Sequence, residues 1–237
     1  MRLYPLLFLL LLIAGAFAVL VGSGDLGDPQ LRDTFLKLRG YRLAAAFLAG
    51  AALAVGGVVV QGLFRNPLAS PSVLGTTAGA SFGGQVALLV AGLGGVGSGF
   101  IVPEMIVPIG CFAGALGALA VLLVFLRITQ DLLALVLTGF VLSALFLSLS
   151  AFVTSIAQET WELGRAVVSF SLGSVGGTGP RQLAFALPLI SAALVACWLW
   201  GRSDDLLLSG EEEAQSMGAT GGAVRWWSAI WVSVLVA

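Results

Sequence analysis

The chain has 237 residues, of which 59% are hydrophobic and 10% are charged, and its formal net charge at pH 7 is -1. Soluble domains carry about 25% charged residues, so this composition excludes an ordinary water-soluble fold. The sequence contains no histidine, the commonest metal ligand and general base, which argues against a zinc- or haem-dependent membrane enzyme.

Apolar runs of roughly 20 residues recur along the chain, and each is long enough to cross a hydrocarbon core about 30 Å thick. The runs lack the alternating pattern of outer-membrane barrel strands. Because backbone polar groups in lipid must be hydrogen-bonded within their own element, we predict an all-α, polytopic helical membrane protein with one transmembrane domain over residues 1–237. Cys111 and Cys197 lie inside apolar runs and are expected to be core residues rather than a disulfide.

Six spans are predicted in chain order, at about residues 6–21, 43–64, 73–93, 105–126, 132–156 and 183–200. The chain ends about a dozen residues into a seventh apolar run that begins near Trp226, which is too short to span. We therefore expect a truncated seventh span. The first run could instead be a signal peptide, because residues 14–18 have cleavage-like spacing of small side chains, although a retained helix is the simpler interpretation.

Polar stretches separate these spans. We predict a loop with a short amphipathic helix at residues 22–42 and a turn at residues 65–71. A segment of mixed composition lies at residues 158–181, and an acidic segment lies at residues 204–213. The distribution of Lys and Arg gives little evidence on orientation. If the N-terminus is cytoplasmic, five arginines lie on the cytoplasmic side of the membrane and six Lys or Arg residues lie on the outer side. The charge bias therefore does not support this orientation, which depends on the resemblance described below.

The predicted spans hold almost no ionisable side chain, whereas proton- or sodium-coupled carriers retain such groups near the membrane midplane. The sequence also lacks a Gly-x-x-x-x-Gly-Lys-[Ser/Thr] phosphate loop, so energy for uphill transport must come from another chain. With no Ser-His pair and no H-E-x-x-H, we predict no enzyme activity, no catalytic residue, no cofactor and no metal site. Hydroxyl groups in the spans are expected to bond back to the helix backbone or across helices rather than to contact cargo; they belong to Thr138, Ser143, Ser148, Ser150 and Thr154.

Residues 61–80 carry the most specific pattern, Q-x-x-x-R-N-P-L-A-x-P-x-x-L-G-x-x-x-G-A. The two prolines stop the preceding helix, while Gly75 and Gly79 permit close packing of the next one. The string resembles the hallmark of the FecCD-type, BtuC-like permeases of ABC importers for iron-siderophore, haem and cobalamin-type metal chelates. The residues that carry this match are Gln61, Arg65, Asn66, Pro67, Leu68, Ala69, Pro71 and Gly75.

Two further segments are similar to this family. Residues 210–218 resemble its G-E-x-x-A-x-x-L-G segment, which forms short cytoplasmic helices that seat on the ATPase subunit; without the resemblance, the run of glutamates is more often a solvated face. The coupling residues implied are Gly210, Glu211, Glu212, Ala214, Met217 and Gly218. Residues 170–174 resemble the family's external W-x-x-G-S.

Arg39-Gly40-Tyr41-Arg42 is similar to the family's R-x-P-R, where arginines meet glutamates of the substrate-binding protein. Two arginines three residues apart share one helical face, and Arg favours carboxylate partners. The resemblance therefore implies a docking role for Arg39 and Arg42. The alternative is an anchor at the membrane edge.

The resemblance implies a multi-pass protein of the inner membrane that acts as the permease subunit of a binding-protein-dependent importer. Its implied partners are ABC ATPase subunits, a periplasmic or lipoprotein substrate-binding protein, a second permease subunit in a homodimer, and membrane lipid, but no nucleic acid. The fifth span would line the path through Leu137, Thr138 and Gly139. Because family members have ten spans, a non-transporting fragment of such a permease stays open as an alternative. A secondary carrier is the other alternative, which the lack of ionisable side chains in the spans disfavours.

Overall fold

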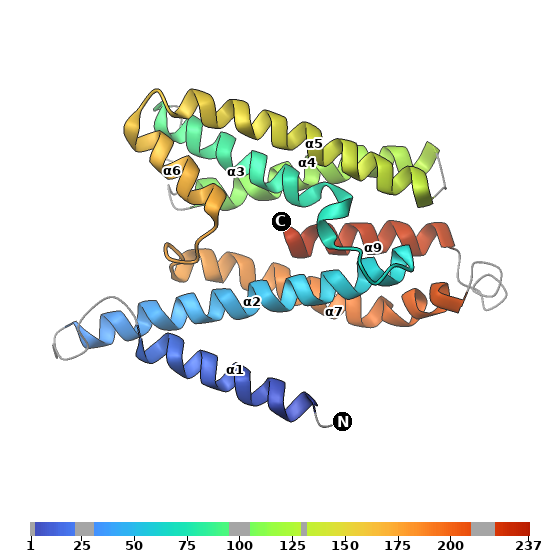
Figure 1. The fold of residues 1–237 in the computed structure, drawn as a ribbon, viewed down its shortest axis with the longest axis horizontal. Helices are drawn as coiled ribbons and strands as arrows, with labels where there is room; N and C mark the ends of the chain where they lie inside the picture. The colour runs from blue at the N-terminus through green and yellow to red at the C-terminus, as the bar shows by residue number, and fades with distance from the viewer. Residues whose placement is uncertain (1–2, 22–30, 95–104, 129–131, 210–220) are drawn as a thin grey trace.

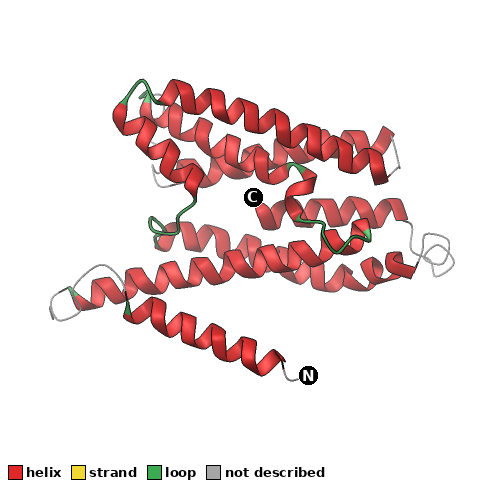
Figure 2. Ribbon diagram, viewed as in Figure 1, coloured by secondary structure: helices red, strands yellow, loops and turns green. Residues whose placement is uncertain are grey.

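The structure is a computed structural model that describes residues 3–21, 31–94, 105–128, 132–209 and 221–237 (Figure 1). Every regular element in these ranges is helical (Figure 2), which confirms the predicted all-α class. The elements are α1 (Leu3–Leu20), α2 (Arg32–Phe64), the 3-10 turn η1 (Pro71–Leu74), α3 (Thr76–Gly92), α4 (Ile106–Ile128), α5 (Leu132–Ala157), α6 (Trp161–Leu172), α7 (Pro180–Ser209) and α9 (Gly221–Val236).

Five described helices are long and apolar enough to cross a membrane, namely α1, α2, α4, α5 and the Pro180–Gly201 part of α7. The predicted third span is shorter than expected, because residues 71–74 coil into η1 and leave α3 with 17 residues. A helix of that length rises only about 25 Å. The helix α9, where we expected an incomplete span, has 16 residues.

Two helices extend beyond their predicted spans. The helix α2 begins at Arg32, so the described part of the predicted 22–42 loop is helical from that residue onward. This segment has no proline, and Asp33 in its first turn complements the helix dipole. The helix α7 continues to Ser209, eight residues past the apolar part that ends at Gly201.

The helix α6 was missed in the mixed segment 158–181. Leu163, Val167 and Phe170 recur at helical spacing on it, and Val167 is fully buried. Glu162 in the first turn complements the dipole of the helix. The amphipathic pattern was therefore present, but too short to stand out beside the long apolar runs.

The helices form two packed groups (Figure 1). The helix α3 packs against α4 and α5, α2 packs against α7, and α9 contacts helices of both groups. The largest fully buried side chains of the core include Val60, Leu74, Leu122 and Val232. We call the end where α2, α4 and α7 finish the Arg65 end, on the right of Figure 1, and the opposite end the α6 end.

Small residues bring α3 and α4 into backbone contact. A Cβ on Gly79 would lie 2.7 Å from the Gly114 carbonyl oxygen, and a Cβ on Gly83 would collide with the Gly110 carbonyl oxygen. The predicted role of Gly79 in close helix packing is confirmed. Cys111 and Cys197 are not joined in a disulfide, as expected; Cys197 is buried and Cys111 is half-buried.

Candidate functional site

The helix α2 ends in a tight turn made by the sequence motif. Arg65 adopts the left-handed conformation, with φ 47° and ψ 35°, which is uncommon for a residue other than glycine. Its N–H donates to the Gly62 carbonyl at 3.2 Å, and the Asn66 N–H donates to the Gln61 carbonyl at 3.1 Å. These bonds satisfy carbonyl groups of the last helical turn. Pro67 cannot continue the helix, so the chain turns away here.

The asparagine of the motif fixes the next part of the turn. Its Oδ1 accepts a hydrogen bond from the Leu68 N–H at 2.9 Å, and its carbonyl accepts one from the Ala69 N–H at 3.0 Å. In such a turn, the side-chain oxygen takes the place of a backbone carbonyl as the acceptor for the N–H two residues further on. Leu68 is 90% exposed, whereas Ala69 is buried. The turn therefore packs against the rest of the protein through the residues that follow Leu68.

The second half of the motif lies directly on α5. A Cβ on Gly75, where φ is 78°, would come within 2.9 Å of the Gly139 carbonyl oxygen, and a Cβ on Gly139 would collide with the Val73 carbonyl oxygen. Ser143 Oγ donates to the Gly139 carbonyl at 2.9 Å and lies 3.4 Å from the Ser72 carbonyl. The structure therefore brings motif residue Gly75 against Gly139, a predicted path residue.

The three predicted path residues differ in their surroundings. Leu137 is 61% exposed, Gly139 is buried under η1, and Thr138 is half-buried with its hydroxyl donating to the Ala134 carbonyl at 2.7 Å. Leu137 is therefore the one of the three whose side chain is largely exposed on this chain. The path role of these residues stays a prediction. The expected return of hydroxyls to the backbone is confirmed at residues 138, 143, 148 and 154. At Ser150 the expectation was wrong, because its buried Oγ has no hydrogen-bond partner among the described residues.

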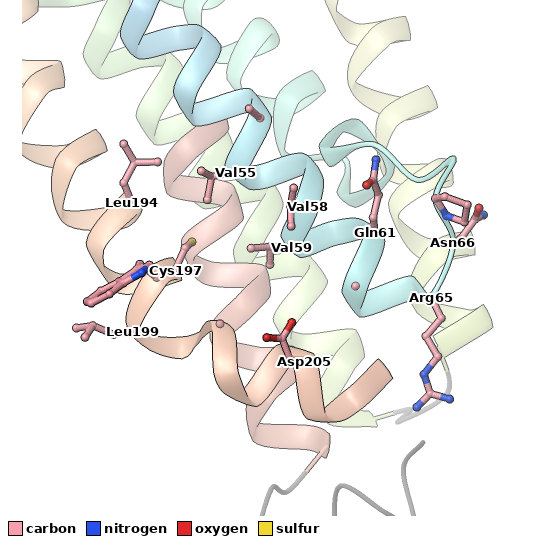
Figure 3. Close-up of a pocket in the computed structure, with 15 residues that line it drawn as sticks. Val55, Val58, Val59, Gln61, Arg65, Asn66, Leu194, Cys197, Leu199 and Asp205 are labelled. Atoms are coloured by element: carbon pink, nitrogen blue, oxygen red, sulfur yellow. The ribbon is translucent and has the colours of Figure 1, made fainter. Parts of the chain in front are cut away.

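An open groove of about 1240 Å³ lies between the end of α2 and α7 (Figure 3). Its walls are mainly apolar, with Val55 and Val58 from α2 and Leu194 from α7. Arg65 of the motif and Asp205 of α7 lie at the Arg65 end of the groove. Gln61 and Asn66 also line it, so the polar residues of the motif border an accessible surface rather than the core.

The predicted docking arginines lie near the α6 end and make intramolecular hydrogen bonds. Arg39 is only 6% exposed, and its Nη1 donates to the Val19 and Leu20 carbonyls at 2.7 and 3.1 Å. A cation at the C-terminus of a helix complements its dipole, so Arg39 secures the end of α1. The Arg42 Nε donates to the Gly176 carbonyl at 3.0 Å, in the loop after α6. Sequence reasoning missed these contacts, and the docking role stays a prediction.

The coupling residues predicted at positions 210–218 lie outside the described residues. The two helices that flank them, α7 and α9, finish and begin at the Arg65 end (Figure 1). In the part of the chain that the structure describes, no group of three His, Cys, Asp or Glu residues is arranged to hold a metal ion.

A polar contact between α3 and α6 was not predicted. Gln85 is 4% exposed, and its Nε2 donates to Ser171 Oγ at 2.9 Å. Ser171 Oγ in turn donates to the Val167 carbonyl at 2.8 Å. The glutamine in an otherwise apolar span was the available signal, since a buried amide requires a partner.

Comparison with known proteins identifies the family. The model of the FecCD transport family matches residues 5–237. The Fe(3+) dicitrate transport system permease protein FecD of Escherichia coli K12 is 31% identical over 240 residues, covering 96% of this chain and 72% of FecD. The molybdate import system permease protein MolB of Haemophilus influenzae is 32% identical over 200 residues, covering 84% of this chain and 56% of MolB.

A solved structure has the same fold. A chain described as a metal-chelate type ABC transporter, in an inward-facing conformation, matches with a TM-score of 0.82 and 29% identity, over 99% of this chain and 73% of that chain. By contrast, this chain spans only about half the length of relatives such as MolB, 56% in that case. The match over residues 5–237 and the five apolar helices establish that the chain belongs to the FecCD transport family and is a multi-pass protein of the inner membrane.

Proposed function

We propose that the chain is the permease subunit of a binding-protein-dependent ABC importer for metal chelates of the iron-siderophore, haem or cobalamin type. The observation that carries this proposal is the seating of the motif turn on α5, where Gly75 and Gly139 meet without intervening side chains. The relatives supply the cargo class, since FecD is named for ferric dicitrate and the solved transporter for metal chelates. MolB is named for molybdate, which makes this oxoanion the competing cargo.

The orientation follows from the family resemblance. The Arg65 end faces the cytoplasm, where residues 210–218 meet two separate ATPase chains, and the α6 end faces the substrate-binding protein. A second copy of the permease completes the path, toward which α5 turns an apolar surface. Leu137, Phe140 and Val141 of this surface are 61%, 69% and 59% exposed in the single chain.

In this proposal, the motif turn transmits motion from the cytoplasmic face to α5. Because the backbones of Val73 and Gly139 touch, a displacement of the turn cannot be absorbed by side-chain rotation. Motion that the ATPases cause at the cytoplasmic face would therefore pass through η1 to α5, which lines the path. Energy comes from the partner chains, so this chain itself binds no nucleotide.

Association and stimulated ATP hydrolysis test the proposal. The chain is co-expressed with the ATPase and binding protein encoded nearest to it, and the membrane complex is purified. We expect the ATPase to co-purify with the chain, and hydrolysis to rise when the binding protein is loaded with a metal chelate but not with molybdate. Hydrolysis by the chain without an ATPase, or stimulation by molybdate alone, would contradict the function or its cargo class respectively.

A further inference from the structure

A cavity of about 400 Å³ opens at the Arg65 end, between the last turn of α4 and the first turn of α9. Its volume lies within the range of about 300–1,000 Å³ that is usual for small-ligand sites. It is distinct from the groove beside α2. The residues that line it are Leu126, Arg127, Gly222, Ala223, Arg225 and Trp226.

Two arginines give this cavity its charge. Arg127 comes from α4 and Arg225 from α9, and no acidic side chain is among the described residues that line the cavity. The guanidinium carbon of Arg127 lies 5.3 Å from the centroid of the Trp226 ring, a cation–π contact that holds the group at the cavity. Leu126 is buried and supplies an apolar floor. The described lining of the cavity is therefore basic at its rim and apolar beneath.

The position of the cavity matches the boundary of the apolar region. Arg127 lies in the last turn of the span that ends at Ile128, and the apolar part of α9 begins at Gly222. Tryptophans gather on the neighbouring turns: the Trp200 and Trp227 rings are 5.5 Å apart, and Trp227 stacks on Trp231 at 6.5 Å. Tryptophan concentrates at the level of lipid headgroups, so the two arginines lie at that level as well.

We infer that this cavity binds the phosphate headgroup of an anionic phospholipid. Guanidinium groups bind phosphate oxygens in paired hydrogen bonds, and basic pockets between the ends of transmembrane helices suit anionic headgroups. The first methylene groups of an acyl chain would lie on Leu126 and Ala223. This inference goes beyond the proposed function, and its test does not rely on that function.

Native mass spectrometry of the full-length chain in mild detergent tests the inference. Phosphatidylglycerol and phosphatidylcholine of equal acyl length are offered at equal concentration. One arginine near a membrane surface strengthens binding to anionic lipid about fivefold. We therefore expect the chain to retain phosphatidylglycerol at least about fivefold more than phosphatidylcholine. Arg127→Gln and Arg225→Gln should each reduce this preference, and the double variant should remove it.

The control variant is Arg165→Gln, which removes one charge from an exposed arginine on α6 at the opposite end. It should keep the full preference for phosphatidylglycerol. Arg127 is exposed, so Arg127→Gln is the variant to score if the double variant does not fold. Equal retention of the two lipids, or an equal loss with Arg165→Gln, would overturn the inference. Displacement of the lipid by millimolar inorganic phosphate would instead identify a site for soluble anions and also overturn it.

Discussion

At the scale of single residues, two glycines determine how closely the motif turn approaches α5. Gly139 has the Val73 carbonyl oxygen where a Cβ would be, and Gly75 has the Gly139 carbonyl oxygen 2.9 Å from its Cβ position. The motif itself suggested Gly75 as a packing residue. The matching role of Gly139 could not be predicted, because nothing local to residue 139 shows which backbone lies over it.

We expect Gly139→Ala to destabilise the protein by about 1–3 kcal/mol, because an added methyl group has no room against the turn. Thermal unfolding in detergent measures the effect. Gly117→Ala is the matched control, since nothing lies within 4 Å of its Cβ position on α4. It should leave the melting temperature unchanged or raise it slightly, since alanine favours a helix more than glycine does. Equal effects of the two variants would show that the turn is not tightly seated.

Arg39 was predicted as a docking residue, and its buried position adds a structural role. No residue of α1 is buried, and Arg39 donates two hydrogen bonds to carbonyls at the end of that helix. Charge-assisted hydrogen bonds contribute about 1.5–3 kcal/mol each where they are buried. Arg39→Ala should therefore loosen α1.

Hydrogen exchange of peptides from residues 3–21 measures this change. We expect faster amide exchange at the C-terminal turn of α1 in Arg39→Ala. Arg42→Ala should leave that exchange as it is, because the Arg42 bond runs to Gly176 instead. Unchanged exchange in Arg39→Ala would mean that other contacts secure the helix.

At the scale of elements, long apolar runs were predictable and short or polar helices were not. The five spanning helices follow from run length, since each must satisfy its backbone within the lipid. The helix α6 and the first turns of α2 carry mixed sequences, in which helix formation depends on tertiary packing such as the burial of Val167. The shortened α3 follows from the turn geometry at Gly75, which a hydropathy pattern does not show.

The segment between α7 and α9 carries the coupling prediction. Ala214 and Met217 would present a small apolar face to a groove of the ATPase, whereas the glutamates would complement the dipole of a short helix. Ala214→Arg should abolish substrate-stimulated ATP hydrolysis with membrane insertion intact, because a large charged side chain cannot enter a small apolar contact. Glu212→Gln should reduce substrate-stimulated ATP hydrolysis much less than Ala214→Arg does. Normal stimulated hydrolysis in Ala214→Arg would refute the coupling role.

At the scale of the whole molecule, the sequence predicted the membrane class and the family motif but not the arrangement of the helices. Close packing of α3 was predicted from Gly79, but the identity of its partner helix α4 was not. The contacts of α9 with helices of both groups, and of Arg127 with Trp226, join segments far apart in the chain. Such contacts depend on the packing of the entire bundle, which local patterns do not encode.

Uptake by proteoliposomes that contain the chain with its ATPase and binding protein tests the importer account most directly. A panel of labelled ferric siderophores, haem, cobalamin and molybdate is added outside, with ATP enclosed on the side of the ATPase. The account predicts accumulation of a metal chelate that requires both ATP and the binding protein and is insensitive to a dissipated proton gradient. Accumulation that proceeds without ATP and collapses with the proton gradient would contradict it, and would identify a secondary carrier instead.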